Sequence, residues 1–161
     1  EHELHKIVWQ KFSELENTHV LASNFSQRLG VYSFYIDDLH FNLAVQLLND
    51  KFGIQVRGGC SCAGTYGHIL LNVQQDQSSS ITKRIDDGDL TTKPGWVRLS
   101  IHPTMTDEEV IFIMKSIEKL AKNHKKWSAD YSCNYETNEF FYKHGSFENK
   151  NKIRAKSWFR L

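Results

Sequence analysis

The sequence predicts an α/β (α+β) two-layer sandwich in which a small mixed sheet carries helices mainly on one face. Segments with helical and with alternating periodicity follow one another in the order α-β-β-α-β-loop-(α)-β-α. Apolar residues make up 40% of the 161 residues and aromatic residues 12%, which suffices for a buried core and excludes a disordered chain. A chain of this length forms one domain of ordinary size.

The first part of the chain predicts one helix followed by two strands. Residues 4–15 place apolar side chains at helical spacing, namely Leu4, Ile7, Val8, Phe12 and Leu15. A short strand is expected at residues 19–22. Residues 31–36 predict a second strand, because they are rich in β-branched and aromatic side chains.

A second helix leads to the loop that carries two of the three cysteines. Residues 41–52 bear one apolar stripe, and Gly53 is placed to end this helix in a left-handed conformation. Residues 54–57 predict a short strand. Gly58 and Gly59 are then expected to interrupt regular structure and to begin the cysteine-bearing loop.

The next segment combines an insertion with a strongly alternating strand. Residues 66–73 predict a helix, and the polar residues 74–93 are expected to be an insertion with a short helix around residues 81–85. Residues 96–101 alternate in character, so Arg98 faces away from the apolar side formed by Val97, Leu99 and Ile101.

The last predicted helix has a defined start. Thr106 and Glu109 have the spacing of a capping box, and apolar residues recur at helical spacing after them. Residues 128–161 carry aromatic side chains without a clear period, which predicts strands or an irregular extension, packed on the domain or mobile. We therefore expect a domain at residues 1–127 and a C-terminal extension at residues 128–161.

Charge, hydropathy and cysteine count exclude several classes of function. The net charge of +1 lacks the basic excess of a nucleic-acid-binding domain. No apolar run approaches the ~20 residues of a membrane span, and no signal peptide opens the chain. Three cysteines are an odd number for a disulfide framework, so we expect reduced thiols and a cytoplasmic protein. The chain starts without Met inside a predicted helix, and we therefore expect a fragment of a longer protein.

The densest chemical feature is the stretch at residues 56–68, in which glycines frame Cys60 and Cys62. The glycines permit backbone conformations that present Cys62 at the tip of a loop, and Arg57 and His68 can favour its thiolate. Two alternatives stay open. One is an inert, buried pair of cysteines in a tight turn, and the other is a zinc site, which the close Cys-x-Cys spacing disfavours.

Arg98 is the second candidate, because a guanidinium group in the middle of a strand must meet an anion, another domain or solvent. Its planar fork matches a carboxylate through two hydrogen bonds. The alternative is a surface charge on an edge strand. His68 and His102 lie near the two candidate segments and are expected to be structural, and the eight histidines form no recognisable set of metal ligands.

Two segments resemble the C-terminal small domain of class V aminotransferase-fold enzymes of fold type I, in the branch of the cysteine desulfurases and selenocysteine lyases. The stretch FGIQVRGGCSCA at residues 52–63 is similar to the family's G-I-x-V-R-x-G-x-x-C-A loop. Residues 97–110 are similar to the family's arginine-bearing strand and the T-x-E-E-V/I helix start that follows it. The similarity runs from about residue 1 to residue 124.

The resemblance implies a role for three residues. Cys62 would be the nucleophile that accepts sulfur and carries a persulfide, Arg98 would grip the α-carboxylate of the substrate, and Arg57 would shape the same pocket. The implied cofactor is pyridoxal 5′-phosphate, whose Schiff-base lysine we expect in a large N-terminal domain outside this chain. We accordingly expect the fragment to be inactive alone.

The resemblance also implies the partners. They are the N-terminal cofactor-binding domain, an amino-acid substrate such as L-cysteine, a sulfur-acceptor protein, and a second copy in the full-length homodimer, with neither nucleic acid nor membrane among them. Two other functions stay open. One is a transaminase or lyase of the same fold in which Cys62 is structural, and the other is a cofactor-free, thiol-bearing interaction module.

Overall fold

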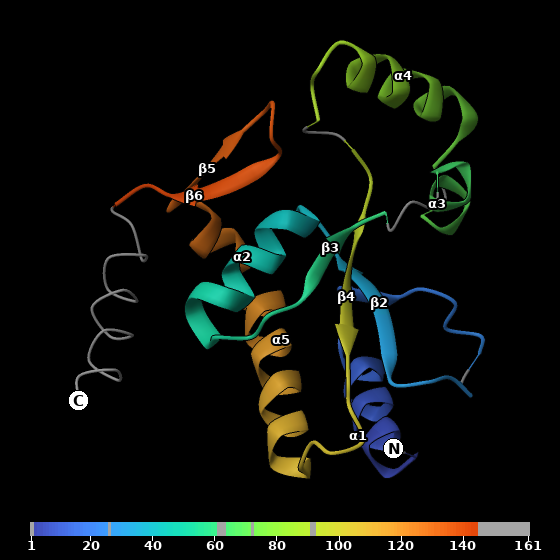
Figure 1. Ribbon diagram of the computed structural model, residues 1–161, viewed down its shortest axis with the longest axis vertical. Coiled ribbons are helices and arrows are strands. Elements are labelled where there is room, and N and C mark those ends of the chain that lie inside the picture. Colours follow the sequence, from blue (N-terminus) through green and yellow to red (C-terminus); the bar gives the residue numbers. More distant parts are fainter. Residues whose placement is uncertain (1, 26, 61–63, 72, 91–92, 145–161) are drawn as a thin grey trace, which may run out of the picture.

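The computed structural model describes residues 2–25, 27–60, 64–71, 73–90 and 93–144. A four-stranded sheet lies at its centre, with the strands in the spatial order β1-β2-β4-β3 (Figure 1). Its strands are β1 (Thr18–Val20), β2 (Val31–Ile36), β3 (Arg57–Gly59) and β4 (Trp96–Ser100). The sheet therefore has β1 and β3 at its edges, and β4, the last of these four strands along the chain, lies in its interior.

All three pairings in this sheet are antiparallel, which corrects the expectation of a mixed sheet. A strand-helix-strand unit brings its two strands into the same direction. The strands β2 and β3 do run in the same direction, since both are antiparallel to β4. However, β4 lies between them, so they never pair with each other.

Three helices cover one face of the sheet, which confirms the predicted two-layer architecture. They are α1 (His2–Ser13), α2 (Phe41–Phe52) and α5 (Asp107–Ser128) (Figure 1). Alternate residues of the strands point into this layer, because side chains of a strand alternate between the two faces. The core is formed by apolar side chains with almost no exposed surface, including Val8, Tyr32, Phe34, Leu47, Val97, Val110 and Ile117.

The ends of two core helices follow the predicted signals. The Thr106 hydroxyl accepts a hydrogen bond from the Glu109 backbone N–H at 3.2 Å, and the Glu109 carboxylate accepts one from the Thr106 N–H at 2.8 Å. Gly53 ends α2 with a φ of 69°, a conformation that favours glycine. Both predicted caps are confirmed, so these two boundaries were readable from local sequence.

The start of α2 carries a cap that the sequence did not reveal. His40 precedes the helix, and its Nδ1 accepts a hydrogen bond from the backbone N–H of Asn42 at 3.1 Å. Burial lowers the pKa of the His40 imidazole below its ordinary value. Because Nδ1 accepts this hydrogen bond through its lone pair, the cap requires the neutral imidazole.

The helix predicted at residues 66–73 is observed as α3 (Gly64–Leu70), and the predicted insertion at residues 74–93 contains α4 (Gln75–Asp86), a longer helix than the one expected around residues 81–85. Both helices lie beyond the end of the sheet in Figure 1. After α5, the strands β5 (Tyr131–Asn134) and β6 (Glu139–Tyr142) form a hairpin beside α2. The Tyr131 hydroxyl donates to the Asp50 carboxylate at 2.9 Å, so a polar contact joins the hairpin to this helix. Within the described part of the chain, no helix combines the length and the apolar character of a membrane span.

Candidate functional site

Around Arg98, the side chains of β4 alternate between the two faces of the sheet. Val97 and Leu99 are 1% and 3% exposed and point into the helical layer, whereas Arg98 between them is half-buried on the opposite face. The predicted orientation of Arg98 is thereby confirmed. The alternative of a surface charge on an edge strand is contradicted, because β4 pairs with β2 on one side and with β3 on the other.

The neighbouring strand β3 brings Arg57 to the same face. Arg57 and Arg98 are direct partners across the antiparallel pair. Directly opposite residues point to the same side of a sheet, with Cβ atoms about 4.5–5.5 Å apart. A Cβ on Gly58, the next residue of β3, would lie 2.9 Å from side-chain atoms of Phe41 and Val45 in α2. Position 58 therefore faces the helical layer, and Arg57 faces away from it.

Gly58 and Gly59 are part of β3, which corrects the expectation that they end regular structure. The observed strand begins at Arg57, three residues later than the predicted start at Ile54. The reason is close packing: without a side chain at position 58, the strand passes directly over α2. Glycine is thus required here for close approach to the helix.

A third polar side chain completes the row across this face. Ser33 in β2 is the direct partner of Arg98 on its other side. The open face of the sheet therefore presents a row of Arg57, Arg98 and Ser33, from the β3 edge toward β1. We call this row the arginine pair with its flanking serine. The serine was missed by the sequence analysis, because strand register is a non-local property.

The electrostatics of the arginine pair are unfavourable without an anion. Among the described residues, neither Arg57 nor Arg98 makes an ion pair or a side-chain hydrogen bond. Like charges placed directly opposite in a sheet repel each other and destabilise it. A carboxylate placed between two guanidinium groups relieves this repulsion and accepts several charge-assisted hydrogen bonds. The pair can therefore act chemically as a carboxylate-binding site.

The predicted nucleophile Cys62 lies outside the described residues. Cys60, which immediately follows β3, is a free and half-buried thiol. His68 lies in α3, which follows Cys62 in the sequence. His102 makes a local contact, with its Nδ1 2.7 Å from the Thr104 hydroxyl, as expected for a structural histidine. Among described residues, no group of three His, Cys, Asp or Glu side chains can hold a metal ion.

The described lysines do not have the environment of a Schiff-base residue. Schiff-base chemistry needs a lysine whose amine is desolvated. No described lysine is buried, and the polar row on the open face contains guanidinium groups and a hydroxyl instead.

The fold and the arginine pair together define an α/β domain with a polar row on one face of its sheet. The family described as "Aminotransferase class-V" matches residues 1–112, a span that includes both arginines. The chain therefore belongs to the class-V aminotransferase family. No curated protein matches it.

One similar solved structure is that of the cysteine desulfurase CsdA (S-sulfonic acid) from Escherichia coli. It is 15% identical in sequence, with a TM-score of 0.45. The similarity covers 74% of this chain and 24% of that chain, so this chain spans only a small part of that protein.

Proposed function

We propose that this chain is the C-terminal domain of a pyridoxal-phosphate-dependent enzyme of the cysteine desulfurase type. Membership in the class-V aminotransferase family supports an enzyme of that cofactor class. The observation that carries the proposal further is the pairing of Arg57 with Arg98 on the face of the sheet opposite the three helices. The cofactor, with its Schiff-base lysine, is held by a domain outside this chain, and the chain alone is inactive.

In this proposal Arg98 binds the α-carboxylate of the amino-acid substrate. Its backbone is fixed by pairing on both sides, so the guanidinium group starts from a rigid support. Arg57 adds a second positive charge to the same site, and Ser33 supplies a hydroxyl beside it. Together they favour an anionic group and orient the substrate relative to the plane of the sheet.

Cys62 accepts the sulfur in the proposed reaction. The Cβ–S bond of L-cysteine breaks, a new S–S bond forms on Cys62, and the Cβ atom gains a proton. L-cysteine and a protein thiol thus give L-alanine and a protein persulfide. The transferred sulfur is oxidised and the Cβ atom is reduced, so the step balances without an external oxidant. A sulfur-acceptor protein then takes the sulfur from the persulfide, and the full-length enzyme is a homodimer.

The test of the nucleophile uses the full-length enzyme that contains this chain, with L-cysteine as substrate. Cys62→Ala should abolish formation of alanine, whereas the matched control Cys60→Ala should retain it, because only the cysteine before Ala63 matches the family loop. Normal alanine formation by Cys62→Ala would remove this residue from the mechanism. Production of a keto acid in place of alanine would instead support a transaminase.

The test of the arginine pair separates binding from chemistry. Arg98→Gln should raise KM for L-cysteine by about tenfold or more, the loss typical of a charge-assisted hydrogen bond of ~1.5–3 kcal/mol. Ser100→Ala, on the same face one pleat away, is the matched control and should leave KM unchanged. An unchanged KM in Arg98→Gln would contradict carboxylate binding.

The isolated chain mixed with pyridoxal phosphate should show no stable, stoichiometric aldimine absorbance band.

A further inference from the structure

The first turn of α2 supports the two strands that carry the arginine pair. A Cβ on Gly58 in β3 would lie 2.9 Å from the Phe41 ring, and a Cβ on Gly95, just before β4, would lie 2.6 Å from the same ring. The Phe41 side chain is 7% exposed. Two neighbouring strands therefore lack a side chain above one aromatic ring, and this ring sets how closely both strands approach the helix.

This contact lies on the reverse side of the proposed carboxylate site. Gly58 follows Arg57 in β3, and Gly95 lies three residues before Arg98 of β4. The strand β3 also leads directly into Cys60 and the loop that follows it. A shift of the aromatic ring would therefore move the arginine pair, and a misplacement of about 1 Å is enough to impair an enzyme site.

His40 holds this ring and the start of α2 together. Its own ring stacks on Phe41 with centroids 4.4 Å apart, and the centroid of Phe140 in β6 lies 5.2 Å away. Its Nδ1 accepts the capping hydrogen bond from the Asn42 backbone N–H. The Asn42 side-chain amide donates to the carbonyl oxygen of Asn138, in the turn of the hairpin, at 2.6 Å. His40 thus lies where the helix, the hairpin and the supporting ring meet.

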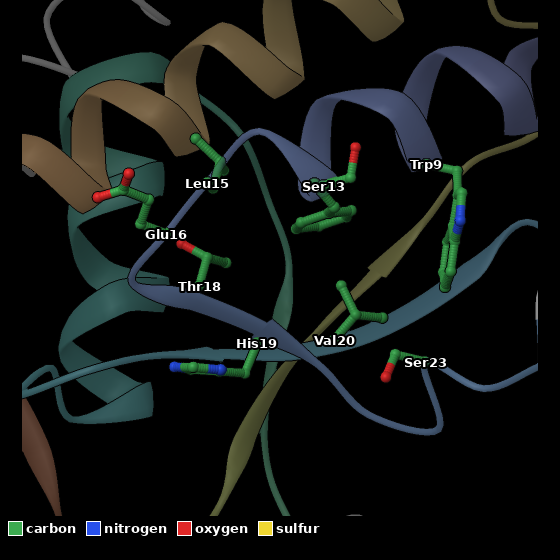
Figure 2. Close-up of a pocket in the computed structure, with 9 residues that line it drawn as sticks. Trp9, Ser13, Leu15, Glu16, Thr18, His19, Val20 and Ser23 are labelled. Carbon is green, nitrogen blue, oxygen red and sulfur yellow. The ribbon is translucent and has the colours of Figure 1, made fainter.

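The second nitrogen of this imidazole is buried without a partner. Four buried side-chain atoms in the described part of the chain make no hydrogen bond, namely Thr18 Oγ1, His40 Nε2, His124 Nε2 and Asn138 Oδ1. Thr18 lies in the wall of the groove between α1 and β1 (Figure 2), far along the sheet from β3. Of the four residues, His40 is the one whose ring stacks on Phe41. Because its Nδ1 accepts, its Nε2 carries the proton of the neutral ring, and this N–H already lacks an acceptor.

The turn before α2 supplies no free carboxylate to compensate a protonated His40. Asp37 contacts the His19 ring at 3.0 Å through both of its oxygens. Asp38 pairs with Lys125 at 2.9 Å. No described residue forms an ion pair with His40 itself. A positive charge on this ring would therefore be unpaired.

The other elements around the imidazole do not supply a counter-charge either. The charged residues of α2, Asp50 and Lys51, lie in its last turn. On the hairpin, Cys133 is the cross-strand partner of Phe140, and burial raises the pKa of its thiol, which keeps it neutral in the range where histidine titrates. Glu139 alternates with Phe140 along β6 and is exposed. Both members of the arginine pair face away from the helical layer.

We propose that His40 is a positioning residue for the arginine pair, and that a proton taken up by this residue from solvent opens the first turn of α2 and weakens binding of the substrate carboxylate. The inference rests on the proposed carboxylate site. The proton occupies the lone pair of Nδ1 that caps the helix and places an unpaired charge between Phe41 and Phe140. The ring of Phe41 then no longer holds β3 and the start of β4 in place.

The direction of the pH dependence follows from burial. Burial lowers the pKa of His40 in the closed turn, whereas in the opened turn the imidazole titrates near its ordinary pKa of about 6.5. The closed turn is therefore fully supported above that pH and is lost progressively as the pH falls through the lowered pKa.

The first experiment measures amide hydrogen exchange in the full-length enzyme that contains this chain. The His40→Asn variant keeps a capping residue but does not titrate. In peptides that cover β3 and the start of β4, the ratio of exchange rates, original protein over variant, should rise about threefold or more from pH 8 to pH 5.5. A ratio that does not change with pH would overturn the proposal.

The second experiment measures KM for L-cysteine in the same two proteins. Between pH 8 and pH 5.5, KM should rise about twofold or more in the original protein relative to His40→Asn, because only molecules with a closed turn bind with full affinity. A difference in KM that is the same at both pH values would indicate a purely structural role and would overturn the proposal.

Two further variants act as controls. His102→Asn removes an exposed histidine that makes a local contact with Thr104, and this variant should follow the original protein in both experiments. The same loss of pH dependence in His102→Asn as in His40→Asn would overturn the assignment to His40. His40→Ser, a second cap that does not titrate, should reproduce the asparagine variant and decides the question if that variant fails to fold. Failure of the carboxylate site itself would appear separately, as an unchanged KM in Arg98→Gln.

Discussion

On the face of the sheet that the helices cover, Tyr32 and Phe34 have no exposed surface and Val97 has 1%, whereas the other face carries Ser33, Arg57 and Arg98. Both sets of residues lie on the same strands, and a shift of one residue along a strand moves a side chain from one face to the other. Burial of the first set stabilises the fold, because each removes apolar surface from water. In the second set, the two arginines repel each other, so a role in stabilising the fold does not explain their placement. A substitution should therefore have a different consequence depending on the face that it alters.

The largest expected effect is on the covered face. Phe34→Ala should lower the free energy of unfolding by about 3–5 kcal/mol, because it removes a completely buried ring and leaves a cavity. Ser33→Ala, the neighbouring residue on the other face, should change it by less than about 0.5 kcal/mol. Chemical denaturation of both variants measures the difference. Similar losses in the two variants would break the contrast between the faces.

A smaller effect is expected where β3 crosses α2. Gly58→Ala should cost about 1–3 kcal/mol, because its Cβ would overlap Phe41 and Val45. The double variant Gly58→Ala/Val45→Ala should recover part of this loss, since it removes one of the two overlapping side chains. Denaturation of the two single variants and the double variant forms a thermodynamic cycle. A purely additive cycle would show that the close approach to Val45 is not the cause.

His40, which caps the start of α2, should contribute about 1 kcal/mol to the free energy of unfolding, and this contribution should depend on pH. His40→Ala should lose roughly 1 kcal/mol near pH 8, the usual contribution of an N-cap side chain. Burial holds the pKa of His40 below its ordinary value, so the unfolded chain binds more protons as the pH falls below about 6.5. The stability contributed by neutral His40 is present above that pH and is lost as the pH falls through the lowered pKa.

The matched control for this pH dependence is His40→Asn. Asparagine caps helices and does not titrate, so the free energy of unfolding of this variant should fall less steeply between pH 7 and pH 5 than that of the original chain. Parallel curves for the two proteins would assign the acid sensitivity to other groups.

The smallest effect, and the one of opposite sign, is expected on the open face. Arg57→Gln should raise the free energy of unfolding by about 0.3 kcal/mol at low salt, because it removes the repulsion across the arginine pair. The gain should disappear near 1 M salt, where the Debye length is about 3 Å. Denaturation at both salt concentrations tests this. Destabilisation at low salt would show that the pair has a compensating partner.

Local patterns predicted the elements and the face of Arg98, but they did not predict which strands meet. The alternation around Arg98 and the capping box of Thr106 involve residues within a few positions of each other, so they were readable from the sequence. The pairing of Arg57 with Arg98 joins residues far apart in the chain, and no local periodicity encodes register. The role of Gly58 could not be predicted for a similar reason, because it depends on how α2 packs on β3.

The interior position of β4 has a consequence for the order in which the chain folds. Within the part of the chain that the structure describes, β3 pairs with β4 alone, and the two strands are separated by α3 and α4. During synthesis on the ribosome, the edge strand with Arg57 must wait unpaired until residue 100 has been made, and closing that long loop costs entropy before any pairing is gained. A first polypeptide that ends between α3 and α4 should therefore leave β3 unpaired until a second polypeptide that contains β4 is added.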